Sequence, residues 1–107
     1  MPALDASALQ LLPRHLLTLQ ALLATHTPEA QVWAYGSRVN GRSHEGSDLD
    51  LVLRNPVDLS QDVPGLVQLQ EALRASDLPM IVEVHQWARL PQAFRFNVEA
   101  GYVVLVA

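Results

Sequence analysis

Two hydrophobic periods alternate along this chain, and that alternation is the strongest constraint on its fold. After Pro13, leucines recur at the spacing of one helix face, as at Leu16, Leu19 and Leu23, until polar residues and a proline end the pattern at 26–28. Other segments are short, apolar and bounded by turn-forming residues, which is typical of strands. The remaining expected helices are 37–41, 63–75 and 90–100, and the expected strands are 31–35, 48–53, 80–84 and 102–106. The pattern predicts an α+β fold with helices packed on a small mixed β-sheet.

Composition limits the protein classes that this chain fits. Of its 107 residues, 50% are hydrophobic, 17% are charged and none is cysteine. That length fits a single domain over residues 1–107, with a core that needs no disulfides. A net charge of −4 disfavours a general nucleic-acid-binding protein, which is expected to carry a basic surface. Because no apolar run approaches the ~20 residues of a membrane span and the first ten residues contain no base, we expect a cytoplasmic protein that contacts neither nucleic acid nor membrane directly.

Two carboxylates open the second expected strand. Asp48 and Asp50 are separated by Leu49, so strand alternation points both side chains to the same face, about 7 Å apart along the strand. Like charges placed in this way repel, and a divalent cation between them would remove the repulsion. Mg²⁺ is bound in proteins through one or two carboxylates together with substrate phosphates. Asp48 and Asp50 are therefore candidate metal ligands, and the alternative is two exposed acids on a strand.

A glycine and a serine follow the first expected strand. Gly36 allows a ligand to approach the backbone closely, and a helix after Ser37 would direct free N–H groups at a phosphate. An isolated Gly-Ser pair is also an ordinary turn. Together with the two aspartates, however, the pair places phosphate donors and metal ligands at one edge of the sheet. That combination is what metal-assisted nucleotide chemistry requires.

A third acid lies within a later apolar strand. Glu83 is flanked by Val82 and Val84, and alternation places Ile81 and His85 on the same face as Glu83. The apolar Ile81 on that face predicts partial burial of Glu83, and a shared metal ion would be a suitable partner for a buried acid. His85 is expected to be a supporting polar residue, because Mg²⁺ prefers oxygen ligands. The alternative is an acid that simply faces solvent.

In combination these residues resemble a known signature. Gly36-Ser37, ten further residues, Asp48-x-Asp50 and a third acid on a later strand are similar to the nucleotidyltransferase signature of the polymerase-beta-like superfamily. The chain resembles the minimal nucleotidyltransferases over residues 32–105, including the run from 82 to 87 and the segment from 90 to 95. The third acid of that family is usually aspartate, and here it is Glu83.

The resemblance implies a role for each matching residue. Gly36 and Ser37 would bind a nucleoside triphosphate, usually ATP, while Asp48, Asp50 and Glu83 would hold two Mg²⁺ ions and carry catalysis. The reaction implied is transfer of a nucleotidyl group with pyrophosphate as the leaving group. Arg38 and Arg42 are candidate phosphate contacts, because guanidinium groups match phosphate geometry. The alternative for both is a solvated surface arginine.

The family also implies a partner protein. Minimal nucleotidyltransferases resemble the antitoxins of two-gene modules whose toxin is a helical HEPN-type ribonuclease, and some of them transfer AMP to a tyrosine of that toxin. The shortness of the chain predicts that another molecule presents the acceptor. One alternative is a non-catalytic antitoxin that neutralises its toxin by binding and occlusion. Another is an enzyme that modifies a small molecule in a homodimer.

Overall fold

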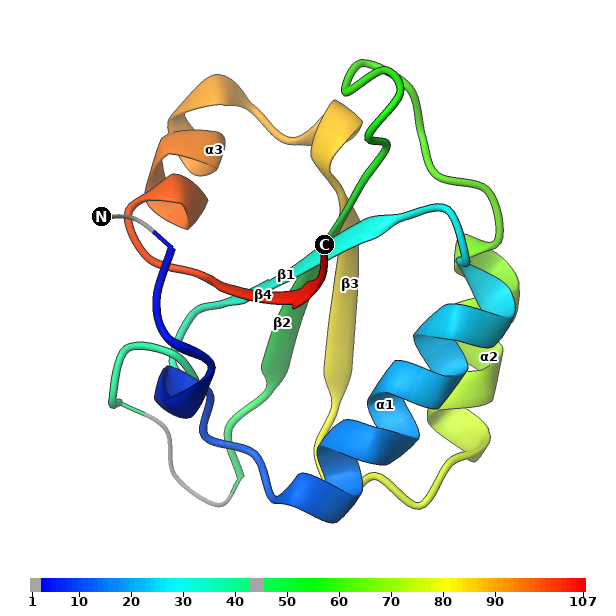
Figure 1. Ribbon diagram of the computed structural model, residues 1–107, viewed down its shortest axis with the longest axis vertical. Coiled ribbons are helices and arrows are strands. Elements are labelled where there is room, and N and C mark those ends of the chain that lie inside the picture. Colours follow the sequence, from blue (N-terminus) through cyan, green and yellow to red (C-terminus); the bar gives the residue numbers. More distant parts are fainter. Residues whose placement is uncertain (1–2, 43–45) are drawn as a thin grey trace.

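The computed structural model describes residues 3–42 and 46–107, and its described part is built on a four-stranded mixed sheet (Figure 1). The strands are β1 (Gln31–Tyr35), β2 (Leu49–Arg54), β3 (Val82–Gln86) and β4 (Val103–Val106). Their order across the sheet is β3-β2-β1-β4. β1 is antiparallel to β2 and β4, whereas β2 and β3 are parallel. The predicted α+β fold with a mixed sheet is therefore confirmed.

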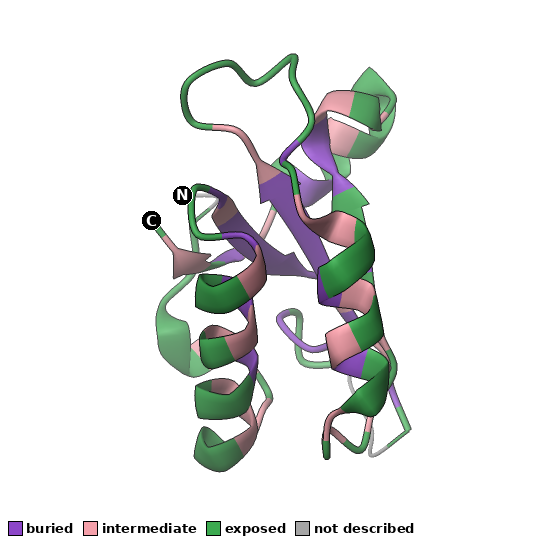
Figure 2. Cartoon of the chain, turned by 90° about the vertical axis from the view of Figure 1, so that its right-hand side faces the viewer, coloured by how far each residue is buried: buried purple, intermediate pink, exposed green. Residues whose placement is uncertain are grey.

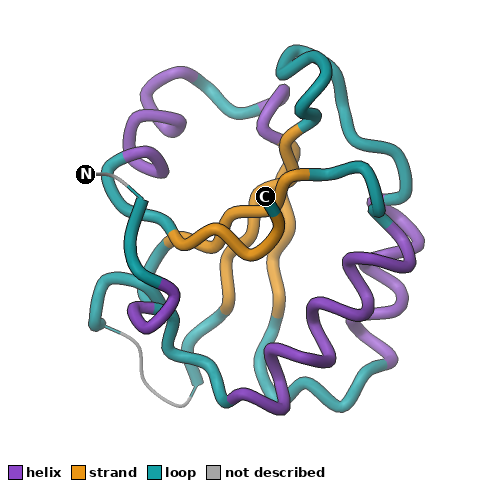
Figure 3. The backbone as a smooth tube through the Cα atoms, in the orientation of Figure 1, coloured by secondary structure: helices purple, strands orange, loops and turns teal. Residues whose placement is uncertain are grey.

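Helices cover the two faces of the sheet unequally. The helices are α1 (Pro13–His26), α2 (Leu66–Ala75) and α3 (Gln92–Glu99), and the 3-10 turns are η1 (Ala6–Ala8) and η2 (Trp87–Arg89). In Figures 1 and 3, α1 and α2 lie on one side of the sheet and α3 on the other. Within the described ranges, no helix has both the length and the apolar character needed to cross a membrane.

The main core lies between the sheet and the pair α1 and α2. Leu49, Leu51 and Leu53 of β2 are at most 1% exposed, and they pack with Leu19 of α1 and Leu69 of α2. This strand alternation and the helical leucine stripes are what the sequence pattern predicts. Figure 2 shows the result, with buried strands behind the two helices and exposed residues on the outer sides of the helices.

A smaller aromatic cluster lies on the opposite face, under α3. The Trp33 ring stacks on Tyr102 with ring centroids 3.8 Å apart and meets Trp87 edge to face at 5.5 Å. The Arg54 guanidinium lies 3.8 Å from the centroid of the Trp33 ring, which adds a cation–π contact. Val98 of α3, at 1% exposed, joins this cluster. The cluster anchors α3 at one end of this face of the sheet.

Several element boundaries differ from the prediction. Residues 37–41 form a turn, because so short a segment gains too few helical hydrogen bonds to be stable. The helix expected from 63 begins at Leu66, and its first turn closes when the Leu69 N–H donates to the Gly65 carbonyl at 2.9 Å. β3 starts at Val82, two residues later than predicted, because it pairs with β2 from Leu49↔Val82 onward.

Gly65 provides a test of this packing. Its φ is +98°, and a Cβ at this position would overlap the backbone carbonyl oxygen of His26. Gly65→Ala is therefore expected to destabilise the protein by roughly 2–5 kcal/mol, from backbone strain plus the steric overlap. The matched control is Gly41→Ala, where φ is +80° but no atom of the described residues lies within 4 Å of the added Cβ. Urea unfolding should show a loss of only about 1 kcal/mol there, and equal losses for the two variants would contradict the packing of α2 against α1.

Candidate active site

Three side chains form a row across the sheet on the face toward α3. Tyr35 of β1 pairs with Asp50 of β2, and Asp50 pairs with Glu83 of the parallel strand β3. Residues that are directly paired point to the same face, and neighbouring strands lie about 4.8 Å apart. The sheet therefore brings Asp50 and Glu83, 33 positions apart in the sequence, side by side. We call Tyr35, Asp50 and Glu83 the acidic row.

Asp48 lies at the start of the same region. It immediately precedes β2, one residue before the strand begins, and it is half-buried like Asp50. Leu49 between them is fully buried in the main core. Leu49 is also anchored to β3, because its N–H donates to the Ile81 carbonyl at 2.9 Å. This anchor holds the Asp48–Asp50 segment beside the strand that carries Glu83.

The turn after β1 contacts the acidic row through Gly36. The φ of Gly36 is +84°, and a Cβ built there would lie 2.5 Å from Asp50 Oδ2. Only glycine lets the backbone pass this close to the carboxylate without strain. The Val39 N–H donates to the Gly36 carbonyl at 3.1 Å and closes the turn. Ser37 follows directly and is half-buried, so the predicted phosphate turn and the predicted metal ligands adjoin in space.

Arg38 has a different position from the one predicted. Its guanidinium is buried, with Nε and Nη2 donating to the Ser47 carbonyl at 3.1 and 3.0 Å and Nη1 donating to the Gln10 carbonyl at 2.8 Å. The Arg38 carbonyl in turn accepts from the Gln10 N–H at 2.7 Å. The guanidinium thus satisfies backbone carbonyls and holds the turn after Gly36 against the segment that leads to Asp48. This structural role was not predicted from the sequence, and a phosphate contact by Arg38 stays a prediction.

Arg42 is exposed at the end of the same turn. Its N–H donates to Asn40 Oδ1 at 3.1 Å, which is an Asx-type turn contact. A phosphate contact by the Arg42 side chain stays a prediction.

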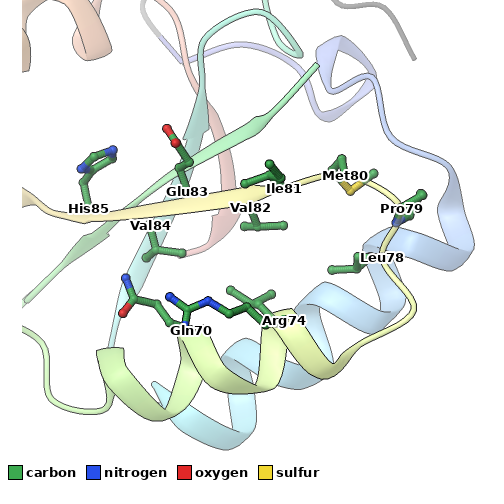
Figure 4. Close-up of a pocket in the computed structure, with 11 residues that line it drawn as sticks. Gln70, Arg74, Leu78, Pro79, Met80, Ile81, Val82, Glu83, Val84 and His85 are labelled. Atoms are coloured by element: carbon green, nitrogen blue, oxygen red, sulfur yellow. The ribbon is translucent and has the colours of Figure 1, made fainter. Parts of the chain in front are cut away.

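Glu83 is more exposed than predicted. Glu83 and His85 are both exposed on β3, and Ile81 on the same face is 67% exposed. The expectation that Ile81 would help to bury Glu83 was wrong. β3 is at the edge of the sheet. On this face, Phe94 of α3 lies near His85, toward the end of β3 away from Ile81. In Figure 4, Glu83 and His85 project to one side of β3, whereas Val82 and Val84 project to the other, toward α2. A cavity of about 610 Å³ lies along β3 beside α2.

In the acidic row, the pKa values of Asp50 and Tyr35 are raised, so the charged forms of these side chains are disfavoured. Burial raises the pKa of Asp50 above its ordinary value of 3.8, and the neighbouring carboxylates of Glu83 and Asp48 raise it further, while His85 opposes the shift. Burial also raises the pKa of the Tyr35 hydroxyl well above its ordinary value of 10.0, with Asp50 and Glu83 adding to the effect. Burial is the largest cause of both pKa shifts, and the neighbouring carboxylates add to each of them. A bound cation would stabilise this arrangement.

The residues present fit a magnesium site. The donors are carboxylate oxygens, which Mg²⁺ prefers, and two of them come from strands paired in register. No cluster of three or more histidine, cysteine, aspartate or glutamate side chains within residues 3–42 and 46–107 is close enough to form a metal cage by itself. Mg²⁺ does not require such a cage, because it usually completes its coordination with water and substrate phosphates.

Two aromatic residues of the site were not predicted from sequence. Tyr35 belongs to the acidic row, and Phe94 of α3 meets the Tyr35 ring edge to face, with centroids 5.9 Å apart. The Phe94 ring also lies 6.4 Å from the His85 ring. For Tyr35 a signal was available, since it directly precedes Gly36 at the end of the strand. For Phe94 the sequence offers none, because its position depends on how α3 returns over the sheet.

The charge repulsion at Asp50 leads to a stability prediction. In the presence of EDTA, Asp50→Asn should leave the melting temperature at neutral pH level or raise it by at most a few degrees. The raised pKa means that the folded protein holds this proton more tightly than the unfolded chain. The ionised carboxylate therefore destabilises the fold above the folded-state pKa, and this penalty is lost as the pH falls through that value toward 3.8.

Thermal melts of the parent and Asp50→Asn across a pH series will test this prediction. The two melting curves should converge at acidic pH, where the parent carboxyl is protonated as well. Asp77→Asn, at an exposed acid outside the acidic row, serves as the control. A variant that melts well below the parent at neutral pH would contradict the repulsion.

Comparison with known proteins identifies the family of this chain. A family model described as "Poly(A) RNA polymerase, mitochondrial-like, central palm domain" matches residues 6–100. The chain is 38% identical over 89 residues to the "Probable protein adenylyltransferase MntA" of Haemophilus influenzae (strain ATCC 51907 / DSM 11121 / KW20 / Rd), a match that covers 80% of this chain and 74% of that protein.

A solved structure has a similar fold. It is described as the "Crystal structure of the toxin-antitoxin with AMP-PNP", and the matched chain has a TM-score of 0.66 and 20% sequence identity. The match covers 88% of this chain and 73% of the other. The palm-domain match over most of the chain and the 38% identity to MntA confirm the resemblance found in the sequence, and the chain is therefore a member of the minimal nucleotidyltransferase family.

Proposed function

We propose that this protein is a magnesium-dependent antitoxin that transfers AMP from ATP to a tyrosine of a HEPN-type ribonuclease toxin. The observation that carries the proposal is the pairing of Asp50 with Glu83 directly beside the Gly36 turn. This pairing supports the proposal because it puts two carboxylates, the oxygen ligands that Mg²⁺ prefers, next to the turn that begins at Gly36. Because the substrate is ATP, the reaction belongs in the cytoplasm.

The chain's own residues have distinct tasks in this reaction. The backbone at Gly36 and the hydroxyl of Ser37 hold the triphosphate. Asp48, Asp50 and Glu83 would hold two Mg²⁺ ions, and the chemistry that these ions would supply is activation of the attacking oxygen and neutralisation of charge on the leaving phosphates. The tyrosine oxygen of the toxin attacks the α-phosphorus of ATP, the bond from that phosphorus to the bridging oxygen of the β-phosphate breaks, and pyrophosphate leaves.

The proton of the attacking hydroxyl needs an acceptor. Glu83 is suited to accept it, because it is the exposed acid of the row and an incoming partner can reach it. Asp50 pairs directly with Glu83, and Tyr35 pairs with Asp50 one strand further into the sheet. Tyr35 keeps its own proton at neutral pH, because the ordinary pKa of its hydroxyl is 10.0 and burial raises that pKa further. It therefore does not compete for the proton that the acceptor releases.

Two similarities support a protein acceptor. The MntA relative is named a probable protein adenylyltransferase, and the structural neighbour is a toxin-antitoxin bound to AMP-PNP. The open face over Glu83 agrees with an acceptor that is presented from outside. The HEPN class of the partner and the tyrosine acceptor rest on the family resemblance.

A transfer assay with this protein and the product of the adjacent gene tests the proposal. The gene adjacent to this one is expected to encode a small helical protein, and that protein is incubated with this chain, Mg²⁺ and ATP labelled at the α-phosphate. The label should appear on a tyrosine of the partner, and peptide mass spectrometry should find the added mass of AMP there. EDTA should stop the transfer.

The same assay separates catalysis from occlusion. A partner that is neutralised and bound tightly, yet never labelled, would favour the non-catalytic antitoxin. Label on a small molecule instead of the partner would favour the homodimeric enzyme. Either outcome would overturn the proposed protein adenylyl transfer.

A further inference from the structure

β3 is an edge strand, and one side of its backbone is unpaired. It pairs only with β2, at the end of the sheet order β3-β2-β1-β4. Leu49 of β2 donates its N–H to the Ile81 carbonyl, which sets the direction of each backbone group along β3. Because these directions alternate, the N–H and carbonyl groups of Val82 and Val84 face away from β2 and pair with no other strand of the described chain. Such an edge is a template for another extended backbone.

A cavity follows this open edge. It is the cavity of about 610 Å³ beside α2, and residues 78 to 85 line it without interruption. Since side chains alternate between the two faces of a strand, this continuous lining puts the cavity along the edge itself, open to both faces. Val82 and Val84 project toward α2, whereas Glu83 and His85 project to the other side (Figure 4). An extended peptide in the cavity would therefore direct alternate side chains toward α2 and toward the side of Glu83.

The wall of the cavity on the side of α2 is largely apolar and carries one positive charge. Leu73 and Leu78 line it together with the valines of β3. Arg74 is exposed on this wall and makes no ion pair with any described residue. A peptide that has an apolar side chain and a carboxylate two residues apart would match this wall in polarity and in charge.

On its other side, the same peptide would meet the acidic row. Residues that lie directly opposite each other on paired strands have Cβ atoms about 4.5–5.5 Å apart. A side chain opposite Glu83 would therefore lie at the exposed end of the acidic row. A hydroxyl on that side chain would be within reach of the Glu83 carboxylate, which is the acid proposed to accept its proton.

We propose that β3 is a docking strand for the acceptor. An extended segment of the partner protein pairs with the open edge, with its acceptor side chain opposite Glu83 and the residues on either side of the acceptor facing α2. The inference rests on the proposed function and adds the way in which the acceptor is presented. Strand addition takes its affinity from main-chain hydrogen bonds and its specificity from the sites for alternate side chains. Arg74 is then a partner-binding residue that selects an acidic residue next to the acceptor.

Amide hydrogen exchange of the full chain, followed by NMR, tests the docking strand directly. The partner in this experiment is the product of the adjacent gene. The Val82 and Val84 amides should exchange rapidly in the free chain and at least about tenfold more slowly in the complex. Amides of β4, the other edge of the sheet, serve as the control and should not change.

Val82→Pro and Val82→Ala form a matched pair. Both remove the valine side chain, but only proline also removes the N–H that faces the open edge. Proline is accepted in edge strands where the N–H faces solvent, so the pairing with β2 should remain. Transfer of labelled AMP to the partner should be at least about tenfold slower in Val82→Pro than in Val82→Ala, while the two variants bind ATP equally well. If Val82→Pro fails to fold, amide exchange of the parent chain still decides the matter.

Charge reversal tests the contribution of Arg74. Arg74→Glu should weaken binding of the partner about tenfold, because it would repel the expected carboxylate. Arg14→Glu is the matched control, since it makes the same charge change at an exposed arginine of α1. It should leave partner binding unchanged, and equal weakening by the two variants would contradict a local role of Arg74.

The outcomes distinguish the docking strand from the proposed function. Transfer by the parent chain with unprotected Val82 and Val84 amides, or with equal rates in Val82→Pro and Val82→Ala, would overturn the docking strand and leave the proposed function standing. Protection of these amides by a second copy of the chain, without the partner, would assign the edge to a homodimer and also overturn the docking strand. A parent chain that neither binds the partner nor transfers AMP to it would overturn the proposed function and the docking strand with it.

Discussion

Asp48→Asn and Asp50→Asn are each expected to reduce nucleotidyl transfer at least about a hundredfold while the protein remains folded. The substitution keeps the shape of the side chain and removes the charge that a metal ion needs. Loss of metal-based stabilisation of a transition state has an effect of several kcal/mol, which sets the scale of the expected loss. The measurement is transfer of labelled AMP to the partner, with circular dichroism as the check that each variant folds.

The matched control for both variants is Asp77→Asn. Asp77 is an exposed acid in the turn before β3, away from the acidic row, so its neutralisation should leave transfer at the parent rate. Full activity of an Asp48→Asn, Asp50→Asn double variant would show that these acids are not metal ligands. Equal loss in Asp77→Asn would point instead to a general effect of net charge.

Glu83→Gln should lower the transfer rate at least about a hundredfold and change ATP affinity far less. Glu83 is the exposed end of the acidic row, where the acceptor approaches, so its loss acts mainly on the transition state rather than on bound nucleotide. Glu83→Asp should retain activity, because the carboxylate remains and aspartate is the usual residue of the family at this position. Single-turnover rates and titrated ATP affinities separate the two effects.

Glu83→Gln also separates an enzyme from an occluding antitoxin. A toxicity rescue assay is run beside mass spectrometry of the partner, with Glu71→Gln on the exposed side of α2 as the control. Rescue by Glu83→Gln without added nucleotide on the partner would support occlusion. Failed rescue by a variant that still folds and binds the partner would support transfer, and Glu71→Gln should rescue in either case.

Local periodicity predicted the elements well and their ends less well. The alternation at Leu49, Leu51 and Leu53 identifies β2 and its buried face correctly, because burial on one face imposes a period of two. The segment 37–41 was expected to be a helix and is a turn, and β3 starts at Val82 rather than at residue 80. Such boundaries depend on which partner strand supplies hydrogen bonds, and that information is not local.

The sequence predicted the positions of some candidate site residues but not of others. Asp48 and Asp50 are two positions apart, and strand geometry predicts a shared side for them, but β2 begins only at Leu49 and contains Asp50 alone. Arg38 was expected at a phosphate, yet its guanidinium is buried against the carbonyls of Ser47 and Gln10. No sequence pattern near Arg38 indicates hydrogen-bond acceptors that lie nine and 28 positions away. The roles of the remaining site residues stay predictions until they are tested by mutation.

The sequence by itself determined the alternation of helices and strands and the signature that identifies the family. These properties arise from spacing within one element or from residue types at fixed separations. Only the tertiary structure decided that Asp50 lies in register between Tyr35 and Glu83, and that Glu83 is exposed at a sheet edge. The physical reason is that strand register follows from burying the whole apolar face of the sheet against α1 and α2, and a shift of one residue would turn every side chain of a strand to the other face.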